Sequence, residues 1–162
     1  MKEIVQEPHA VLRQVAVPVS VEAITGSEVQ DIIANMNEAL DREDDGVAIA
    51  APQIGVPLRI FVVSKKASKQ LSQNTAFINP EIIRIGKLKE DLSEGCLSVR
   101  WKYGTVKRST SATVRALNAE GNEFVMSGRG LLAQIFQHEV DHLNGILFID
   151  KAKDVEDLPP AA

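Results

Sequence analysis

The segment at residues 137–142, Gln-His-Glu-Val-Asp-His, holds two of the three histidines of this chain. His138 and His142 are four residues apart, so on a helix both project from one face and can bind the same metal ion. Glu139 lies beside the first histidine and can transfer protons to and from a metal-activated water. The segment therefore indicates a metal-dependent hydrolase.

A third ligand is needed to complete such a site. A zincin-type search looks downstream, where only Asp150, Asp154, Glu156 and Asp157 follow, in no convincing arrangement. Upstream, the single cysteine, Cys96, would complete a Cys/His/His set and leave a fourth position open to water, as in catalytic metal sites. The alternative interpretation of Cys96 is a small, buried apolar side chain, and that of the histidines is a pair of half-buried imidazoles.

Three motifs, in the same order along the chain, resemble those of the peptide deformylases. They are Gly-Val-Ala-Ile-Ala-Ala-Pro-Gln at 46–53, Glu-Gly-Cys-Leu-Ser at 94–98 and His-Glu-Val-Asp-His at 138–142. The likeness extends to Leu12-Arg13 and Pro18-Val19, and it covers nearly the whole chain. It implies an enzyme that removes the N-formyl group from the N-terminal formylmethionine of newly synthesised polypeptides and releases formate.

The resemblance also implies roles, position by position. Glu139 would be the general base and acid, and the Gln53 side chain and the Leu97 backbone N–H would donate hydrogen bonds to the developing oxyanion. The metal ligands would be Cys96, His138 and His142. The cofactor is then one divalent metal ion, and the resemblance implies Fe(II) as the native one. Because a thiolate and two imidazoles also suit Zn(II), Ni(II) and Co(II), these are expected in purified samples.

The substrate site is expected around the small-residue segment 46–51, because short side chains let a peptide approach the backbone and pair with it as an added strand. The expected substrate-binding residues are Val47, Ala48, Gly95, Leu131 and Ile135. The apolar members would surround the methionine side chain, although plain core packing is an equal alternative for Leu131. Glu94 is expected to pair with Arg108 and brace the Cys96 segment; alternatively, Arg108 lies on the exposed face of a strand.

Three positions depart from the family pattern. Ala48 replaces a second glycine, Gln134 occupies a position that is more often apolar or arginine, and Arg100-Trp101-Lys102-Tyr103 follows where many relatives have proline. None of these changes removes a metal ligand or Glu139. They affect the expected rim of the substrate site, so they bear on peptide preference beyond formylmethionine.

The elements that position these residues can be predicted from periodicity. Val29, Ile33 and Met36 recur at helical spacing and predict a helix over about 26–42, begun by a Thr25/Glu28 capping box. A second, metal-binding helix is predicted over about 128–144, with Gly145 as its stop. Strands are expected at 58–64 and within 77–85, and a hairpin joins 105–117 to 123–126. Residues 46–55 are expected to form a loop.

Strands in runs around two separated helices favour an α+β fold, with mixed or antiparallel sheets packed around the helix at 128–144. At 162 residues the chain is expected to form a single catalytic domain, 1–162, with a frayed tail at about 152–162.

The composition limits the partners and the compartment. The formal net charge is −4 and no basic run stands out, which argues against nucleic-acid binding. No segment resembles a signal peptide or reaches transmembrane length, so no membrane contact is expected. One cysteine fits a reducing, bacterial-type cytoplasm, or an organelle if a transit peptide has been removed. The expected partners are N-formyl-methionyl nascent peptides, with transient ribosome association.

Two other functions remain open from the sequence. An HExxH endopeptidase would need a third ligand downstream and a long open cleft, and Cys96 and Gln53 argue against it. A non-catalytic, metal-stabilised module would not need Glu139 or Gln53, and both are present.

Overall fold

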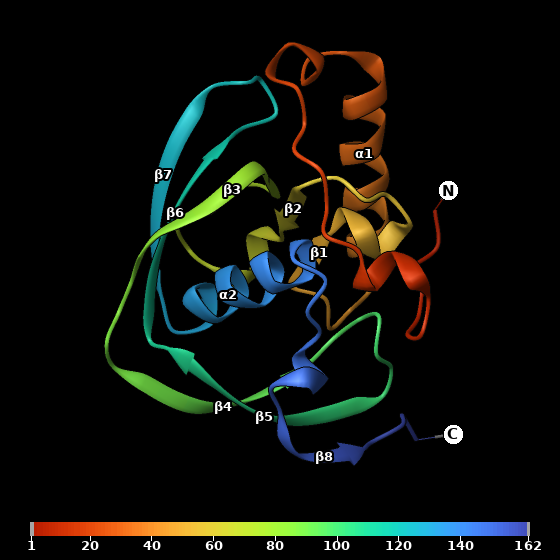
Figure 1. The fold of residues 1–162 in the computed structure, drawn as a ribbon, viewed down its shortest axis with the longest axis vertical. Helices are drawn as coiled ribbons and strands as arrows, with labels where there is room; N and C mark the ends of the chain where they lie inside the picture. The colour runs from red at the N-terminus through yellow and green to blue at the C-terminus, as the bar shows by residue number, and fades with distance from the viewer. Residues whose placement is uncertain (1, 162) are drawn as a thin grey trace.

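The computed structural model describes residues 2–161, which form two α-helices and two antiparallel sheets (Figure 1). The helices are α1 (Ser27–Asp41) and α2 (Leu131–Leu143). One sheet has the order β1-β2-β3-β6-β7, comprising Ala48–Ala50, Ile60–Val63, Thr75–Ile85, Ser111–Leu117 and Glu123–Arg129. The other has the order β4-β5-β8, comprising Lys89–Gly95, Lys102–Ser109 and Lys153–Asp157. The predicted α+β class is confirmed.

The helix α2 lies at the centre of the fold and contacts strands of both sheets (Figure 1). Its buried face includes Phe136, which packs into an aromatic cluster with Phe61 of β2 and Phe77 of β3. Phe61 and Phe77 stack with their ring centroids 4.6 Å apart, and Phe136 meets Phe77 edge-on at 5.5 Å. Offset and edge-on aromatic contacts stabilise the fold beyond the burial of apolar area, so they fix the position of the central helix against the sheet.

The ends of α2 are set by two glycines. The helix begins three residues later than predicted, because residues 128–129 pair in β7 and Gly130 turns the chain with a φ of +57°. Gly145 ends the helix with a φ of +76°, as predicted. A side chain at Gly145 would also lie 2.6 Å from the Arg13 carbonyl oxygen, so both the conformation and the space require glycine.

The N-terminal helix agrees with its predicted span, but the predicted capping box is wrong. Gly26 is the N-cap, and it has no side chain with which to cap the helix. Burial compensates for the missing cap: Ile33, Met36 and Leu40 of α1 pack into a second core cluster that also contains Ile49. Tertiary packing therefore stabilises this helix more than its first turn does.

The β6–β7 hairpin is confirmed, with its turn around Gly121. The predicted strand at 105–117 is in fact two strands, β5 and β6, which separate at Thr110 and belong to different sheets. Residues 46–55, expected as a loop, contain β1 and a 3-10 turn at Ala51–Ile54. The strand β4 was missed because five of its seven residues are charged or polar, and it therefore lacks an apolar alternation.

The tail expected to fray at 152–162 contains a strand instead, although Ala162 lies outside the described residues. The strand β8 pairs with β5, so that Lys102 lies opposite Asp157, and every side chain of β8 is exposed. Backbone pairing to the central strand β5 orders these residues without side-chain burial, which a pattern of apolar residues does not reveal. Within residues 2–161, no helix is long and apolar enough to cross a membrane.

Candidate metal centre

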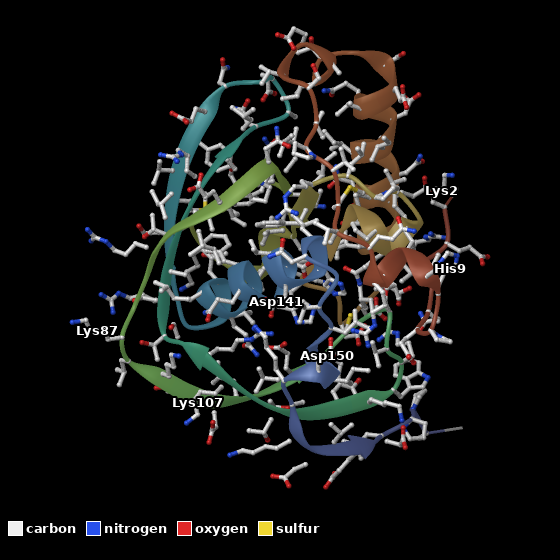
Figure 2. The ribbon with its side chains drawn as sticks, viewed as in Figure 1. Lys2, His9, Lys87, Lys107, Asp141 and Asp150 are labelled. Atoms are coloured by element: carbon white, nitrogen blue, oxygen red, sulfur yellow. The ribbon has the colours of Figure 1, made fainter. Side chains whose placement is uncertain are left out.

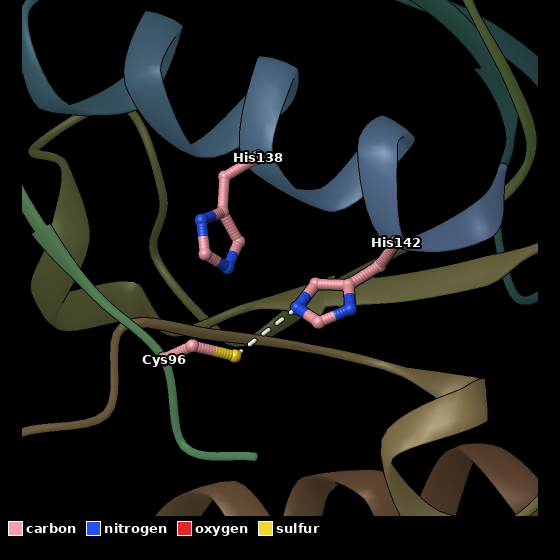
Figure 3. Close-up of side chains that lie close together, drawn as sticks. All are labelled: Cys96, His138 and His142. Atoms are coloured by element: carbon pink, nitrogen blue, oxygen red, sulfur yellow. Dashed lines mark hydrogen bonds between the residues drawn. The ribbon is translucent and has the colours of Figure 1, made fainter. Parts of the chain in front are cut away.

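Cys96, His138 and His142 meet between the end of β4 and the central helix (Figure 3). Cys96 directly follows β4, and the two histidines lie one turn apart on α2. One ligand atom from each residue lies within 4.8 Å of the other two. The Cys96 Sγ lies 3.2 Å from the His142 Nε2. Among the described residues, this is the only group of three such ligands, and it is the set that the sequence predicted.

The ring of His138 is oriented by a buried carboxylate. Its Nδ1 lies 2.7 Å from the Oε2 of Glu94, two residues before Cys96. A carboxylate that accepts a hydrogen bond from one ring nitrogen leaves the other nitrogen free to bind a metal and increases its basicity. The Nε2 of His138 is therefore the atom available to a cation.

Glu94 also forms a two-point ion pair with Arg108 of β5. The Arg108 Nε donates to Oε1 at 3.0 Å and its Nη2 donates to Oε2 at 2.6 Å. The remaining Nη1 of Arg108 donates to Asp141 of α2 at 2.8 Å. The expected Glu94–Arg108 pair is confirmed. The alternative, that Arg108 lies on the exposed face of a strand, is wrong, since Arg108 is 3% exposed. Its neighbour Lys107 occupies the outer face of β5, as alternation along a strand requires (Figure 2).

These partners control the protonation of Glu94. Burial alone would raise the pKa of its carboxyl group, but the hydrogen bonds from His138 and Arg108 outweigh that effect and lower the pKa to about 2. The Glu94 carboxylate thus stays ionised at neutral pH and holds both His138 and Arg108 in place.

Glu139 is the other carboxylate beside His138, and its environment is different. Its side chain is buried, yet its Oε2 has no hydrogen-bond partner among the described residues. Burial raises the pKa of this carboxyl group to about 7. A buried carboxyl group with a free oxygen and a pKa near neutrality can both accept and release a proton.

Gln53 is held in one orientation by its neighbours. Its Oε1 accepts a hydrogen bond from the Ala50 N–H at 2.8 Å, which directs the Nε2 toward the Cys96 side of the site. The Nε2 lies 3.1 Å from the Ser98 hydroxyl and 3.6 Å from the Cys96 sulfur. No described residue accepts a hydrogen bond from the Leu97 N–H. The Leu97 N–H is therefore unengaged within the described residues, and the Gln53 amide lies beside the candidate ligands with one N–H directed at the Cys96 sulfur.

A cavity of about 310 Å³ opens onto this group. It is lined by every residue expected at the substrate site, Val47, Ala48, Gly95, Leu131 and Ile135. It is also lined by Gln53, Cys96, Leu97, His138 and Glu139. The alternative interpretation of Leu131 as plain core is not supported, because its side chain is 45% exposed.

Of the positions that depart from the family pattern, Ala48, Arg100, Tyr103 and Gln134 line the cavity. Arg100 forms ion pairs with Glu43 at 2.7 Å and with Asp45 at 2.9 Å, so it joins the Cys96 segment to the segment before β1. The Tyr103 ring packs so closely on Gly95 that a side chain at Gly95 would lie 2.6 Å from it. These contacts make Arg100 and Tyr103 ordered parts of the cavity wall.

Sequence reasoning missed two supporting residues. Ser98 belongs to the second motif, but its hydrogen bond with Gln53 was not expected. The available signal was a hydroxyl group two residues after the candidate ligand Cys96. Asp141 was not expected to pair with Arg108, although its place within the histidine motif puts it close to the site. Neither contact joins residues that are near in sequence.

The residues present fit a divalent cation. A thiol and two imidazoles are ligands that Fe(II) and Zn(II) accept, and their spacing leaves one face open to the cavity. The Nδ1 of one histidine is supported by Glu94, as is usual for a metal ligand. The buried Oε2 of Glu139 lacks a partner within residues 2–161, which is costly unless a bound group or water occupies the site.

Comparison with known proteins places the chain in a family. The family model described as polypeptide deformylase matches residues 1–157. A curated peptide deformylase of Halothermothrix orenii is 46% identical over 141 residues, which cover 87% of this chain and 86% of that protein.

Solved structures agree with this relationship. A peptide deformylase of Legionella pneumophila is 38% identical, has a TM-score of 0.86, and the match covers 95% of this chain and 87% of that one. A class I type b peptide deformylase of Acinetobacter baumannii, bound to Met-Ala-Ser, is 30% identical with a TM-score of 0.84, over 91% of this chain and 96% of that one. With the fold, the metal-ligand set and these relatives in agreement, the chain belongs to the polypeptide deformylases, the enzymes that remove the formyl group from N-terminal formylmethionine.

Proposed function

We propose that this chain, as one catalytic domain, hydrolyses the formyl–nitrogen bond of formylmethionyl peptides with Glu139, Gln53 and the Leu97 N–H as its catalytic groups. The observation that carries this assignment is the meeting of the Cys/His/His ligand set with an unpartnered, buried carboxylate in one cavity. Bound to Cys96, His138 and His142, a divalent cation supplies Lewis acidity, which polarises a carbonyl group and lowers the pKa of water.

Glu139 moves the proton. As a carboxylate it accepts a proton from the attacking water, and the water oxygen forms a bond to the formyl carbon. It then passes that proton to the leaving nitrogen as the carbon–nitrogen bond breaks, which yields formate and a free N-terminus. A pKa raised toward 7 by burial suits both transfers, since the group is neither a very weak base nor a very weak acid near neutral pH.

Gln53 and Leu97 stabilise the negative charge that develops on the formyl oxygen. The Gln53 amide is oriented before substrate arrives, because the Ala50 N–H and the Ser98 hydroxyl bind its two ends. The Leu97 N–H has no acceptor within the described residues, so a substrate oxygen can take that place. Donors that need no rearrangement are effective in this role, and one is worth about 3–4 kcal/mol of barrier.

The substrate peptide is proposed to lie beside β1. Within residues 2–161 this strand lies at the edge of the five-stranded sheet and pairs with β2 on one side. On its other side the Ala50 N–H donates to Gln53, and the backbone before Ala50 is proposed to pair with an extended peptide. The methionine side chain then enters the cavity between Val47, Leu131 and Ile135. The solved relative that binds Met-Ala-Ser supports this substrate class.

We propose Fe(II) as the native metal, with Zn(II), Ni(II) and Co(II) as replacements in purified samples. The donor set suits each of them, and family resemblance supports iron. Elemental analysis of protein purified without oxygen, beside protein purified in air, measures this directly. Iron in neither preparation would contradict the proposal.

The setting in the cell follows from the substrate. Because formylmethionine is present on newly made chains, we propose a cytoplasmic enzyme that meets its substrates while transiently associated with the ribosome. Co-sedimentation with ribosomes that carry formylated nascent chains, compared with empty ribosomes, tests this. Equal absence from both pellets would contradict association.

The test of the reaction is formate release from formyl-Met-Ala-Ser under anaerobic conditions by metal-replete enzyme, compared with Glu139→Ala. Formate is expected with the wild type and not with the variant. No release by the wild type would overturn the proposed function. A peptide without a formyl group serves as the control for endopeptidase activity, and no cleavage of it is expected. An endopeptidase of this type would need a third metal ligand after α2, and two of the acidic residues there, Asp150 and Asp157, pair instead with Arg13 and Lys102.

A further inference from the structure

Gln134 lies on α2 one turn before His138, and both residues bind the same carboxylate. The Gln134 Nε2 donates to the Oε1 of Glu94 at 3.1 Å, while the Nδ1 of His138 lies 2.7 Å from the Oε2 of Glu94. The two oxygens of Glu94 are therefore attached to one helix at two points, four residues apart. A two-point attachment fixes the plane of the carboxylate relative to the helix, which a single hydrogen bond cannot do.

The same amide is anchored to the strand that carries Glu94. The Gln134 Nε2 donates a second hydrogen bond to the Ser93 carbonyl oxygen at 3.1 Å. Both amide hydrogens are thus used, one on the backbone of β4 and one on the Glu94 side chain. This arrangement explains how a polar residue can line the cavity beside Leu131 and Ile135 without a loss of hydrogen bonding.

Arg108 does not make this contact redundant. It approaches Glu94 from β5 and also donates to Asp141, so it sets the distance between β5 and α2. Among residues 2–161, only Gln134 and His138 link Glu94 directly to the helix that carries the metal ligands. We infer that Gln134 is a positioning residue, which holds the Glu94 carboxylate in the orientation that directs His138 toward the metal, while its stem forms part of the cavity wall.

The substitution Gln134→Leu tests the inference. Leucine retains the approximate size and the apolar wall but removes both hydrogen bonds. The expected result is a loss of Zn(II) affinity of about threefold to tenfold, below the usual 10- to 100-fold for a direct partner of a metal ligand, because Gln134 acts through Glu94. The absorption bands of the Co(II)-loaded variant should shift as well, since the His138 ring is less firmly oriented.

Two further variants separate positioning from packing. Gln134→Arg keeps donors that can reach Ser93 and Glu94, so its Zn(II) affinity should stay within about twofold of wild type by the same reasoning. Gln30→Leu is the matched control. The Gln30 amide likewise donates two hydrogen bonds, here to the carbonyl oxygens of Ile24 at 2.7 Å and Ala119 at 2.9 Å, and it lies on α1 rather than on the metal-binding helix. It should leave Zn(II) affinity and the Co(II) spectrum unchanged.

The inference is overturned if Gln134→Leu binds Zn(II) as tightly as wild type, or if the Leu and Arg variants lose the same affinity. If the Leu variant does not fold, Gln134→Met provides the same comparison with a more adaptable side chain. Steady-state kinetics add a second distinction: kcat should fall for Gln134→Leu while KM for formyl-Met-Ala-Ser does not rise, because the cavity wall remains apolar. Only these kinetics depend on the proposed function. Zn(II) affinity is measured without substrate, so the inference about Gln134 can fail while the wild type still releases formate.

Discussion

Glu94, near the end of β4, and Glu139, in the middle of α2, lie on either side of His138 and are buried to the same degree, at 6% and 3% exposure. Their surroundings differ completely. Both oxygens of Glu94 accept hydrogen bonds, whereas the Oε2 of Glu139 has no partner among the described residues. Their pKa values are correspondingly about 2 and about 7.

The difference shows that burial alone does not decide what a carboxylate does. Donors from two elements, β5 and α2, keep Glu94 ionised, so it acts as a fixed support for a metal ligand. Glu139 faces the cavity with no compensating donor, and burial therefore brings its pKa to a value at which it can exchange protons. Four predictions test this contrast.

The largest effect is expected from Glu139→Gln. The amide has the same shape but cannot accept and return a proton, so kcat/KM should fall by about 10²–10⁴-fold. Zn(II) affinity and thermal stability should stay close to wild type, because the Oε2 of Glu139 has no hydrogen bond to another described residue that the substitution could remove. A loss of activity below tenfold would show that Glu139 is not the proton carrier.

Glu94→Gln should act on structure and metal binding instead. The substitution leaves the buried Arg108 without its closest charged partner, which costs about 3–5 kcal/mol of unfolding free energy for a broken buried pair. Zn(II) affinity should fall about 10- to 100-fold, since His138 loses a charged acceptor. Urea unfolding of the metal-free protein measures the first effect, and competition with a chelator measures the second.

Glu90→Gln is the matched control for this experiment. Glu90 lies on the same strand, is exposed, and should change stability by less than about 0.5 kcal/mol. Equal effects of the two substitutions would contradict the supporting role of Glu94.

The two carboxylates should also respond to pH in different ranges. Protonation of Glu139 removes the base, so kcat/KM should fall as pH drops, with a midpoint between the ordinary 4.5 and the raised value of about 7, because a bound cation favours the carboxylate. The pKa of Glu94 is lowered from 4.5 to about 2, so its contribution to stability is present above pH 4.5 and is lost as pH falls toward 2. Activity profiles and unfolding curves across this range check both. A single shared midpoint would contradict the distinction.

The smallest effect is expected from Asp157→Asn. Asp157 pairs with Lys102 at 2.9 Å, but the two side chains are 72% and 41% exposed. An exposed pair is screened by water and salt, so the loss should be below about 1 kcal/mol in urea unfolding. A cost as large as that of Glu94→Gln would show that partner geometry matters more than burial for these ion pairs.

Local sequence was sufficient for a large part of the site. The four-residue spacing of His138 and His142 and the lone Cys96 predicted the ligand set, and the family resemblance implied Gln53 as an oxyanion donor. The structure brings these residues together. The helices were found from apolar periodicity. The strands β4 and β8 were missed because neither has an apolar alternation, and the Thr25 cap was wrong because packing, not the first turn, stabilises α1.

The sequence by itself determined which chemical groups are present and which of them share a helix face, because i to i+4 spacing has a single geometric meaning on a helix. Apart from the expected Glu94–Arg108 pair, only the tertiary structure decided which partner each group received. Glu94 and His138 are 44 residues apart, and Gln134 and Ser93 are 41 apart, so no local pattern joins them. The roles of the two carboxylates depend on those long-range contacts, since hydrogen-bond partners and burial set their pKa values.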